Sequence, residues 1–342
     1  MRVFVGMSGG VDSSLSAALL VEQGYDVTGI YMKNWTQDLP GMRCPWADDL
    51  ADAKRVAVQL NIPFEVYDFE SEYRHKVVDY MISEYTAGRT PNPDIMCNQE
   101  VKFKLFLQTA LDSGADMIAT GHYARTNNGK LFRAQDDIKD QTYFLYRVTK
   151  EALLRTLFPL GDYTKSQVRQ MAEDRGLITA RKKDSQGICF VGSVGIREFL
   201  NQYIETTPGE IIDKDSGKTV GAHEGAIFYT LGQRHGLDVG GGMPYYVVGK
   251  DTAKNEVYVS RNLNDESMWR TNLRLTDMHW IDQSPRPLES ILVRLRHRGN
   301  LLSAHLAGDT LQLDSPERAV ASGQSAVVYS GDEVLGGGIV SI

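Results

Sequence analysis

The stretch Val3-Phe4-Val5-Gly6-Met7-Ser8-Gly9-Gly10-Val11-Asp12-Ser13-Ser14, near the start of the chain, decides the fold. Residues 3–7 form an apolar run that predicts a buried strand, and residues 13–23 have the pattern of a helix that ends at Gly24. Only a glycine-rich turn separates the two segments. Strand, turn and helix in direct succession are typical of a parallel sheet flanked by helices, so we expect an α/β fold.

The turn from Ser8 to Ser14, called the phosphate loop below, has the features of an anion site. At a helix N-terminus the backbone N–H groups and the helix dipole favour negative charge, and glycines allow close approach. Ser13 and Ser14 can add hydroxyl donors, and Asp12 can hold a metal ion or cap the helix. No lysine follows the glycines, so the loop is not a Walker A motif. It resembles the SGGxDS loop of the N-type ATP pyrophosphatases, which implies cleavage of ATP to AMP and pyrophosphate with an adenylated acceptor.

Strand-like and helix-like segments continue to alternate after this unit. We predict strands at 26–32, 63–69 and 116–120, and helices at 50–59, 72–85, 100–113 and 164–175. A short helix at 196–203 then precedes glycine-rich turns. From about residue 272 onward the segments are short and β-like (290–296, 301–306, 310–313, 326–329 and 338–342), which suggests a small barrel or sandwich. We therefore expect three domains: a Rossmann-like ATP pyrophosphatase catalytic domain at 1–195, a small central module at 196–268, and a C-terminal β-barrel at 269–342.

The composition is that of an ordinary soluble globular protein, with 342 residues of which 42% are hydrophobic and 24% charged. The net charge of -7 argues against a surface covered in positive potential, but a local basic face would be enough to bind RNA. The start of the chain lacks the pattern of a signal peptide, and no stretch approaches the roughly 20 apolar residues that span a membrane. Three scattered cysteines without a Cys-x-x-Cys or a Cys/His cluster fit a reducing cytoplasm and no protein metal site.

Two of the three cysteines have surroundings that favour the thiolate. The proline-stiffened loop 90–98 leads into a predicted helix and places Cys97 at or near its N-terminus, where the pKa of a thiol falls. Asp94, three residues earlier, can carry a proton or orient a neighbour. Cys189 follows a pair of lysines, which also favour the thiolate. Two alternatives stay open: Cys97 could be inert and Cys189 a small buried apolar residue. Cys44 has no comparable context.

Further motifs extend over nearly the whole chain. They are Tyr31-Met32-Lys33-Asn34-Trp35, Gly88-Arg89-Thr90-Pro91-Asn92-Pro93-Asp94 with Cys97, Ala119-Thr120-Gly121-His122-Tyr123, Lys139-Asp140-Gln141, Lys183-Asp184-Ser185 with Ile188-Cys189-Phe190, Thr230-Leu231-Gly232-Gln233-Arg234, Gly323-Gln324-Ser325-Ala326 and Leu335-Gly336-Gly337-Gly338. With this set the chain resembles the tRNA-specific 2-thiouridylase family of the N-type ATP pyrophosphatase superfamily. The resemblance implies a tRNA-uridine 2-sulfurtransferase that thiolates the wobble uridine of tRNA with ATP, accompanied by Mg²⁺.

The resemblance also implies a mechanism. In that family the C2 oxygen of the uridine is adenylated, and a cysteine persulfide then delivers sulfur to C2 with loss of AMP. By position, Cys189 would carry the persulfide and Cys97 would be the partner nucleophile that closes a disulfide with it. Asp94 would be the acid or base beside the target base. The sulfur implies a donor protein, such as a cysteine desulfurase or a relay protein.

Binding residues follow from the same resemblance. It places ATP contacts at Gly6, Met7, Ser8, Gly9, Gly10, Val11, Asp12, Ser13, Met32 and Gly121. It places the target uridine beside Asn92, Pro93 and Asp94. It places tRNA contacts at Lys139, Asp140, Gln141, Arg296 and His297, with Gln324 as a weaker candidate. His122 would orient the nucleotide or the substrate, although a histidine after a central strand could equally cap the next turn.

The segment Arg294-Leu295-Arg296-His297-Arg298 alternates within a predicted strand, so we expect its three arginines on one face, where they could follow phosphates. The alternative is a solvated face that protects a sheet edge. A wobble uridine must be taken out of the anticodon stack, which would explain the domains added to the catalytic one.

Two other functions compete with this interpretation. An amidating synthetase with the same loop would need an ammonia source, and the chain has no glutaminase-like module. An inactive RNA-binding protein would leave the joint presence of Asp12, Asp94, Cys97 and Cys189 unexplained.

Overall fold

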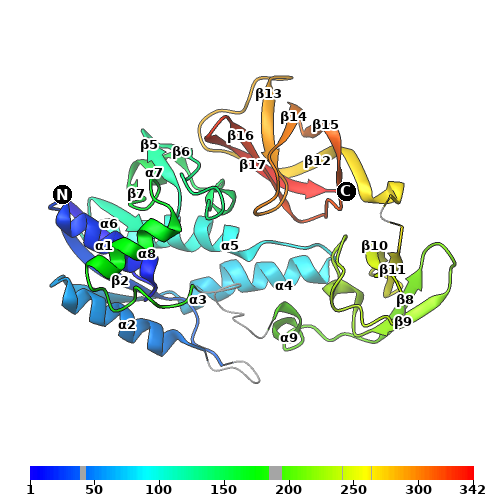
Figure 1. Cartoon of the computed structure of the whole chain (residues 1–342), viewed down its shortest axis with the longest axis horizontal. Coiled ribbons are helices and arrows are strands. Elements are labelled where there is room, and N and C mark those ends of the chain that lie inside the picture. Colours follow the sequence, from blue (N-terminus) through cyan, green and yellow to red (C-terminus); the bar gives the residue numbers. More distant parts are fainter. Residues whose placement is uncertain (39–43, 185–194, 241, 263) are drawn as a thin grey trace.

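The computed structural model describes residues 1–38, 44–184, 195–240, 242–262 and 264–342. A parallel five-stranded sheet in the order β3-β2-β1-β4-β7 forms its N-terminal part (Figure 1). The strands are β1 (Arg2–Gly6), β2 (Asp26–Lys33), β3 (Phe64–Asp68), β4 (Met117–Thr120) and β7 (Thr156–Leu157). The predicted α/β fold and its first strands are therefore confirmed.

Strand β1 lies near the centre of this sheet, with β2 on one side and β4 on the other. Its residues Val3, Phe4 and Val5 are completely buried, as expected for a parallel strand covered on both faces. The helices of this part are α1 (Val11–Glu22), α2 (Trp46–Gln59), α7 (Lys150–Leu154) and α8 (Lys165–Asp174). Helix α1 follows β1 directly, so the carboxyl end of the central strand leads into the phosphate loop.

Two long helical runs lie beside the sheet, and each contains a π-helix. The first consists of α3 (Glu70–Tyr73), η1 (Arg74–Val78) and α4 (Asp79–Thr86), and the second of α5 (Pro93–Met96), η2 (Cys97–Leu105) and α6 (Phe106–Asp112). The second run begins seven residues before the predicted helix at 100–113. The reason is that Asn92 caps it and Pro93, whose missing N–H costs nothing at this position, is its first residue.

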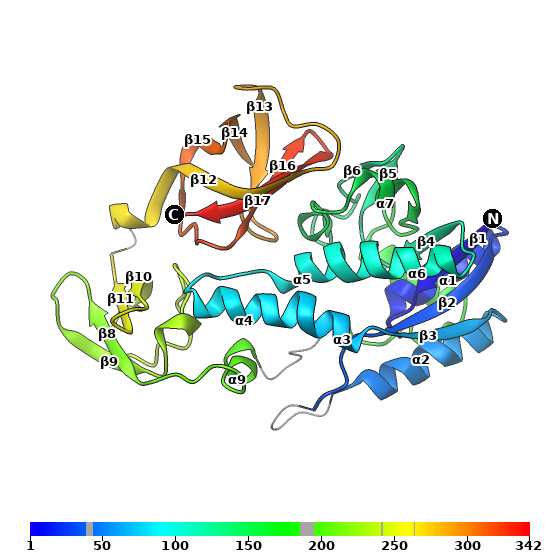
Figure 2. The ribbon, with the colours of Figure 1, turned by 180° about the vertical axis from the view of Figure 1, so that it is seen from behind.

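The central module is a small sheet in the order β10-β11-β8-β9. It is formed by β8 (Gly209–Asp213), β9 (Thr219–His223), β10 (Tyr246–Asp251) and β11 (Glu256–Ser260), together with the short helices α9 (Ile196–Leu200), η4 (Ala226–Phe228) and η5 (Glu266–Met268). Figures 1 and 2 show this sheet and the parallel sheet at opposite ends of the molecule, with the helical runs between them.

The C-terminal part is a closed antiparallel barrel, as predicted. Its strands are β12 (Trp269–Trp280), β13 (Ser290–Arg294), β14 (Leu302–Ala307), β15 (Thr310–Arg318), β16 (Ser325–Ser330) and β17 (Glu333–Ser341), and pairing of β12 with β17 closes it. The hairpin of β5 (Arg125–Asn127) and β6 (Lys130–Phe132) also pairs with β17, through Leu131 and Val334. The N-terminal part therefore contributes two strands to the sheet of the barrel.

A buried ion pair also joins these two parts. Arg294 at the end of β13 donates from Nη1 to Oδ2 of Asp140 at 2.9 Å, and the two side chains are 7% and 0% exposed. The carboxylate of Asp140 also accepts from the hydroxyl of Thr142, in the short helix η3 (Thr142–Phe144), at 2.9 and 3.0 Å.

The structure around this ion pair corrects one sequence-based expectation and bears on a second. The three arginines do not share a strand face, because β13 ends at Arg294; that side chain is buried, whereas Arg296 and Arg298 are exposed beyond the strand. The tRNA contact of Asp140 stays a prediction; in the structure its carboxylate is covered and binds Arg294.

Among the described residues, no helix combines the length and apolar character needed to cross a bilayer.

We predict that Arg294→Met destabilises the chain by about 3 kcal/mol, because it leaves the Asp140 carboxylate buried without its cation. Urea denaturation followed by circular dichroism measures this loss. The double variant Arg294→Met, Asp140→Asn should be less destabilised than the sum of the two single variants, since neither charge is then left alone. Strict additivity would contradict a coupled pair.

Candidate functional site

Serine side chains of the phosphate loop form hydrogen bonds with the loop's own backbone. The backbone N–H of Ser8 donates to Oγ of Ser13 at 3.1 Å, and the hydroxyl of Ser14 donates to the carbonyl of Gly10 at 2.8 Å. Gly10 is the N-cap of α1, and no side chain caps this helix. Helix starts that lack a side-chain cap keep N–H groups available to a bound anion, so the geometry supports the predicted phosphate site.

Glycines bring the other predicted ATP residues against this loop. Gly9 has a φ of +73°, and a Cβ there would collide with the carbonyl of Asp49. A Cβ on Gly121 would lie 2.8 Å from the backbone nitrogen of Ser13, and one on Gly6 would lie 2.9 Å from Cε of Met32. The structure therefore gathers Gly6, Met32 and Gly121 around the loop at the carboxyl ends of β1, β2 and β4.

A lysine that the sequence analysis missed contacts the loop. Lys165 Nζ donates to both carboxylate oxygens of Asp12, at 2.7 and 2.9 Å, and lies 2.9 Å from Asp184. The hydroxyl of Tyr123 donates to the same Asp12 carboxylate at 2.9 Å. Thr164-x-x-Gln167 does signal a capping box and the start of α8. Nothing in the sequence, however, indicates that this helix start lies beside a loop 150 residues earlier.

Asp184 lies at the centre of three cations. Lys139 approaches it at 2.8 Å and Arg169 at 2.6 Å, in addition to Lys165. Burial opposes ionisation of this carboxyl, but the hydrogen bonds from Lys139 and Lys165 outweigh burial and lower its pKa to about 2. Asp184 therefore stays ionised at all physiological pH values and fixes the position of these side chains. Lys139, a predicted tRNA contact, is held here in an ion pair.

The predicted nucleophile Cys97 lies one helical turn inside the second helical run. Asn92 caps the run by accepting from the backbone N–H of Asp94 at 3.1 Å, and Cys97 is its fifth residue and 3% exposed. Cys97 thus lies near the helix N-terminus, as expected, but one turn inside it, because the helix already begins at Pro93. Asp94 and Cys97 are three residues apart and lie on the same side of the helix.

Asp94 and His122 are both pushed towards their neutral forms by burial. The pKa of Asp94 is raised by burial, which the nearby charge of Lys102 partly offsets. The pKa of His122 is far below its ordinary value because of burial and, second, the charge of Lys102. Nδ1 of His122 lies 2.8 Å from Oγ1 of Thr120 and Nε2 lies 3.5 Å from Nζ of Lys102. An ammonium can only donate, so Nε2 accepts and Nδ1 carries the proton.

The predicted tRNA residues fall into separate groups. Gln141 accepts the backbone N–H of Tyr123 at 2.9 Å, behind the phosphate loop. The ring of His297 lies 4.4 Å from that of Phe144, while the exposed Arg296 pairs with Glu317. Gln324 donates to the carbonyl of Thr90 at 2.7 Å, which is an intramolecular role that the sequence did not suggest.

Thr90, in the segment 88–92, contacts both C-terminal domains, so that all three parts of the chain meet at this residue. From the barrel, the carbonyl of Ser322 accepts the Thr90 N–H at 3.0 Å, alongside Gln324. From the central module, Thr230 lies 3.2 Å from Thr90, hydroxyl to hydroxyl. Because residues 92–94 follow directly, both added domains help to position the predicted uridine site.

The predicted persulfide carrier Cys189 lies outside the described residues. Cys44 is buried, with Sγ 3.7 Å from the carbonyl of Trp35, and burial raises the pKa of its thiol. No group of three metal-binding side chains occurs in the part of the chain that the structure describes.

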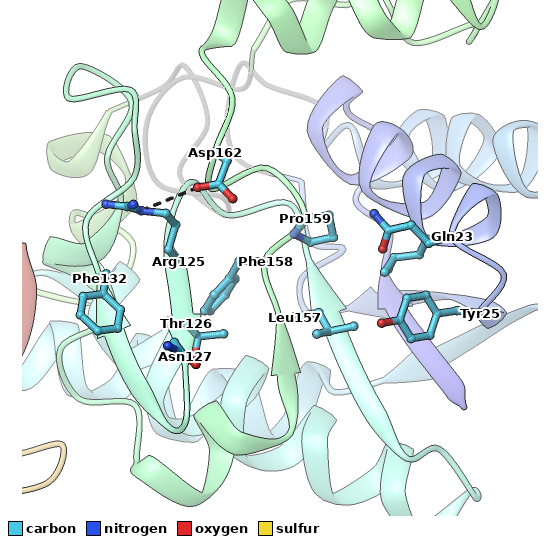
Figure 3. A pocket seen from close by; sticks show the side chains of 11 residues that line it. Gln23, Tyr25, Arg125, Thr126, Asn127, Phe132, Leu157, Phe158, Pro159 and Asp162 are labelled. Atoms are coloured by element: carbon cyan, nitrogen blue, oxygen red, sulfur yellow. Dashed lines mark ion pairs between the residues drawn. The ribbon is translucent and has the colours of Figure 1, made fainter.

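A cavity of about 470 Å³ lies away from these residues, between the end of α1, the β5–β6 hairpin and the segment after β7 (Figure 3). It is lined by Leu20, Gln23, Tyr25, Arg125, Thr126, Asn127, Phe132, Leu157, Phe158, Pro159 and Asp162. None of the predicted ATP or tRNA residues lines it. Its closest link to the site is Phe158, whose ring meets that of His122 edge to face at 6.2 Å.

We predict that Gly121→Ala weakens ATP binding at least about tenfold, because the new methyl group would push the Ser13 backbone out of place. Isothermal titration calorimetry with ATP measures the change. Gly249→Ala is the matched control, since a Cβ there meets only ordinary contacts at 3.6 Å or more. Equal affinities of the two variants would show that the loop tolerates displacement.

We also predict a pH-dependent stability difference for Asp94→Asn. A raised pKa means that the folded state of the parent chain binds the Asp94 proton more tightly than the unfolded state does, so the parent loses stability as pH rises above about 4. The asparagine variant has no such loss. The melting temperature of the variant relative to the parent should therefore increase from acid to neutral pH, and a constant difference would refute the effect of burial.

Comparisons with known proteins cover the whole chain. Three family models match: a tRNA methyl transferase HUP domain over residues 1–193, a tRNA methyl transferase PRC-barrel domain over 197–261 and an aminomethyltransferase beta-barrel domain over 270–340. A solved 4-thiouridine synthetase–RNA complex with bound ATP aligns at 15% identity, with 59% of this chain and 50% of that chain covered, but its TM-score of 0.40 is too low to support a functional inference.

Two curated relatives are much more similar. The tRNA-specific 2-thiouridylase MnmA of Geobacillus thermodenitrificans is 46% identical over 99% of this chain and 94% of the relative. The protein of the same name from Lactococcus lactis subsp. cremoris is 43% identical over 100% of this chain and 95% of the relative. The chain therefore belongs to the tRNA-specific 2-thiouridylase family of tRNA sulfurtransferases.

Proposed function

We propose that this chain uses ATP to convert the wobble uridine of tRNA into 2-thiouridine. The observation that carries the proposal is the phosphate loop, whose helix start has no side-chain cap and against which Asp49 and Gly121 pack too closely to leave room for a Cβ on Gly9 or Gly121. Near full-length similarity to proteins named tRNA-specific 2-thiouridylase supports tRNA as the acceptor. The proposed domains are 1–195 for catalysis, 196–268 as the central module and 269–342 as the barrel that contacts tRNA.

In the first step, the C2 oxygen of the uridine attacks the α-phosphorus of ATP. The bond from this phosphorus to the bridging oxygen breaks and pyrophosphate leaves, held by the amides at the start of α1. The uridine loses its N3 proton in forming the adenylated intermediate. Asp94 would accept that proton, since its raised pKa makes it a stronger base than an exposed carboxylate.

In the second step, the terminal sulfur of a persulfide on Cys189 attacks C2. The thiolate of Cys97 then attacks the inner sulfur of Cys189, and the electron pair of the broken S–S bond stays with the sulfur on C2. N3 takes back its proton from Asp94, AMP leaves with the C2 oxygen, and the two cysteines remain as a disulfide. An external thiol must supply two electrons before a sulfur donor protein, such as a cysteine desulfurase or a relay protein, reloads Cys189. This need for reduction favours the cytoplasm.

Magnesium would accompany ATP in this scheme. The Asp12 carboxylate provides the oxygen ligands that Mg²⁺ prefers, and it lies in the first turn of α1. The ion would neutralise part of the charge on the phosphates.

The tRNA would be held mainly by the barrel. Arg296 and Arg298 are exposed and can meet phosphates, while the half-buried His297, whose ring is tilted by 42° against that of Phe144, offers a ring for contact with RNA. Lys139 and Gln141, the other predicted tRNA contacts, bind Asp184 and the backbone of Tyr123, near the phosphate loop. His122, kept neutral, would serve as a hydrogen-bonding group for nucleotide or substrate rather than as a cation.

We predict that Cys97→Ser and Cys189→Ser each abolish thiolation while tRNA binding survives, because each removes one sulfur that the transfer needs. Mass spectrometry of digested tRNA detects 2-thiouridine and separates it from methylated uridine, the product that the domain descriptions would suggest. Cys44→Ser is the control and should retain activity. Normal 2-thiouridine from either of the first two variants would exclude the mechanism.

A further inference from the structure

We propose that Lys165 binds the β- and γ-phosphates of ATP, supplying the cation that the phosphate loop itself lacks. This inference rests on the proposed use of ATP and assigns a further residue to it. The loop has no lysine of its own, yet release of pyrophosphate increases negative charge on the leaving phosphates and requires a compensating positive group.

The contacts of the nearby cations single out Lys165. Its ammonium binds Asp12 inside the loop, at the first turn of α1. Lys182, by contrast, is held by Asp49 and Asp52 of α2, at 2.7 Å each. Arg169 reaches Asp184 and the carbonyls of Ala180 and Lys182. Of these three described cations, Lys165 is therefore the one that contacts the phosphate loop, where the phosphates would bind.

Lys165 is also held in position before any nucleotide arrives. It is the first residue of α8, whose capping box fixes the helix start, and its backbone N–H donates to Asp136 at 2.9 Å. The side chain is 12% exposed and lies over the ring of Tyr123 at 5.8 Å. Such a preorganised cation stabilises developing charge without first having to reorganise.

The two carboxylates explain how the ammonium can serve phosphates. Asp12 and Asp184 share one ammonium, so Lys165 can exchange its Asp12 contact for phosphate oxygens and still keep Asp184. Asp184 remains ionised, with a pKa of about 2, and continues to bind the ammonium of Lys165. Asp12 is then available to the magnesium ion that accompanies ATP.

The test compares affinities for ATP, inorganic pyrophosphate and AMP, measured by calorimetry with magnesium and without tRNA. Lys165→Met should weaken ATP and pyrophosphate binding about tenfold or more, because a hydrogen bond between charged groups is lost, and should leave AMP binding almost unchanged. Lys165→Arg, which keeps the charge, should recover part of the loss. Lys150→Met is the matched control: Lys150 is likewise the first residue of a capped helix, but it pairs with Asp282.

Two outcomes would overturn the inference: unchanged ATP affinity in Lys165→Met, or an equal loss for AMP, which would indicate collapse of the loop. Thermal melting checks the fold, and Lys165→Arg replaces the methionine variant if the latter is unfolded, with a weaker ATP affinity and unchanged AMP affinity as the expected result. If the parent chain binds ATP but never adenylates tRNA, the proposed function fails while the role of Lys165 stands. If the parent adenylates tRNA and the Lys165 variants bind ATP normally, only this inference fails.

Discussion

The buried ion pair between Arg294 and Asp140 is the interaction on which the arrangement of the site depends. Asp140 lies between Lys139, which reaches Asp184, and Gln141, which holds the backbone of Tyr123. Tyr123 in turn contacts Asp12 in the phosphate loop. A side chain of the barrel thus sets the position of a three-residue segment whose two other members bind Asp184 and Tyr123, beside the phosphate loop. The cost of burying two charges is tolerable because Asp140 also accepts from Thr142.

Sequence reasoning predicted the local units well because their signals are local. A buried strand, a glycine turn and a helix follow one another at the start of the chain, and Gly9 and Gly121 lie too close to neighbouring backbone atoms to carry a Cβ. The barrel followed from short segments separated by turns. The predicted start of the second helical run was seven residues too late, because Asn92 and Pro93 start a helix within a motif that reads as a loop.

Contacts between residues that are distant in the sequence could not be predicted from the sequence. The alternation of arginines in 294–298 suggested that all three lie on one face of a strand. Strand β13 ends at Arg294, however, so the sequence pattern extends beyond the strand. Lys165 and Lys102 carry no motif, and their importance comes from what lies opposite them. Burial around Cys97 likewise depends on packing. It produces a region of low polarity in which the Asp94 carboxyl and the His122 imidazole both resist ionisation. Groups kept neutral in this way are suited to exchange protons rather than to act as permanent charges.

Because the β5–β6 hairpin pairs with β17, the sheet of the barrel includes residues far outside 269–342. Leu131 of β6 is completely buried and pairs with Val334, and Glu333 binds Lys130 at 3.0 Å. Cutting the chain before residue 269 would therefore expose an unpaired strand edge and an apolar side chain on the remaining piece, the combination that drives aggregation. The barrel, for its part, would lose the hairpin that covers β17. The two ends of this protein are better regarded as one cooperative unit, in which loss of either part compromises the solubility of the other.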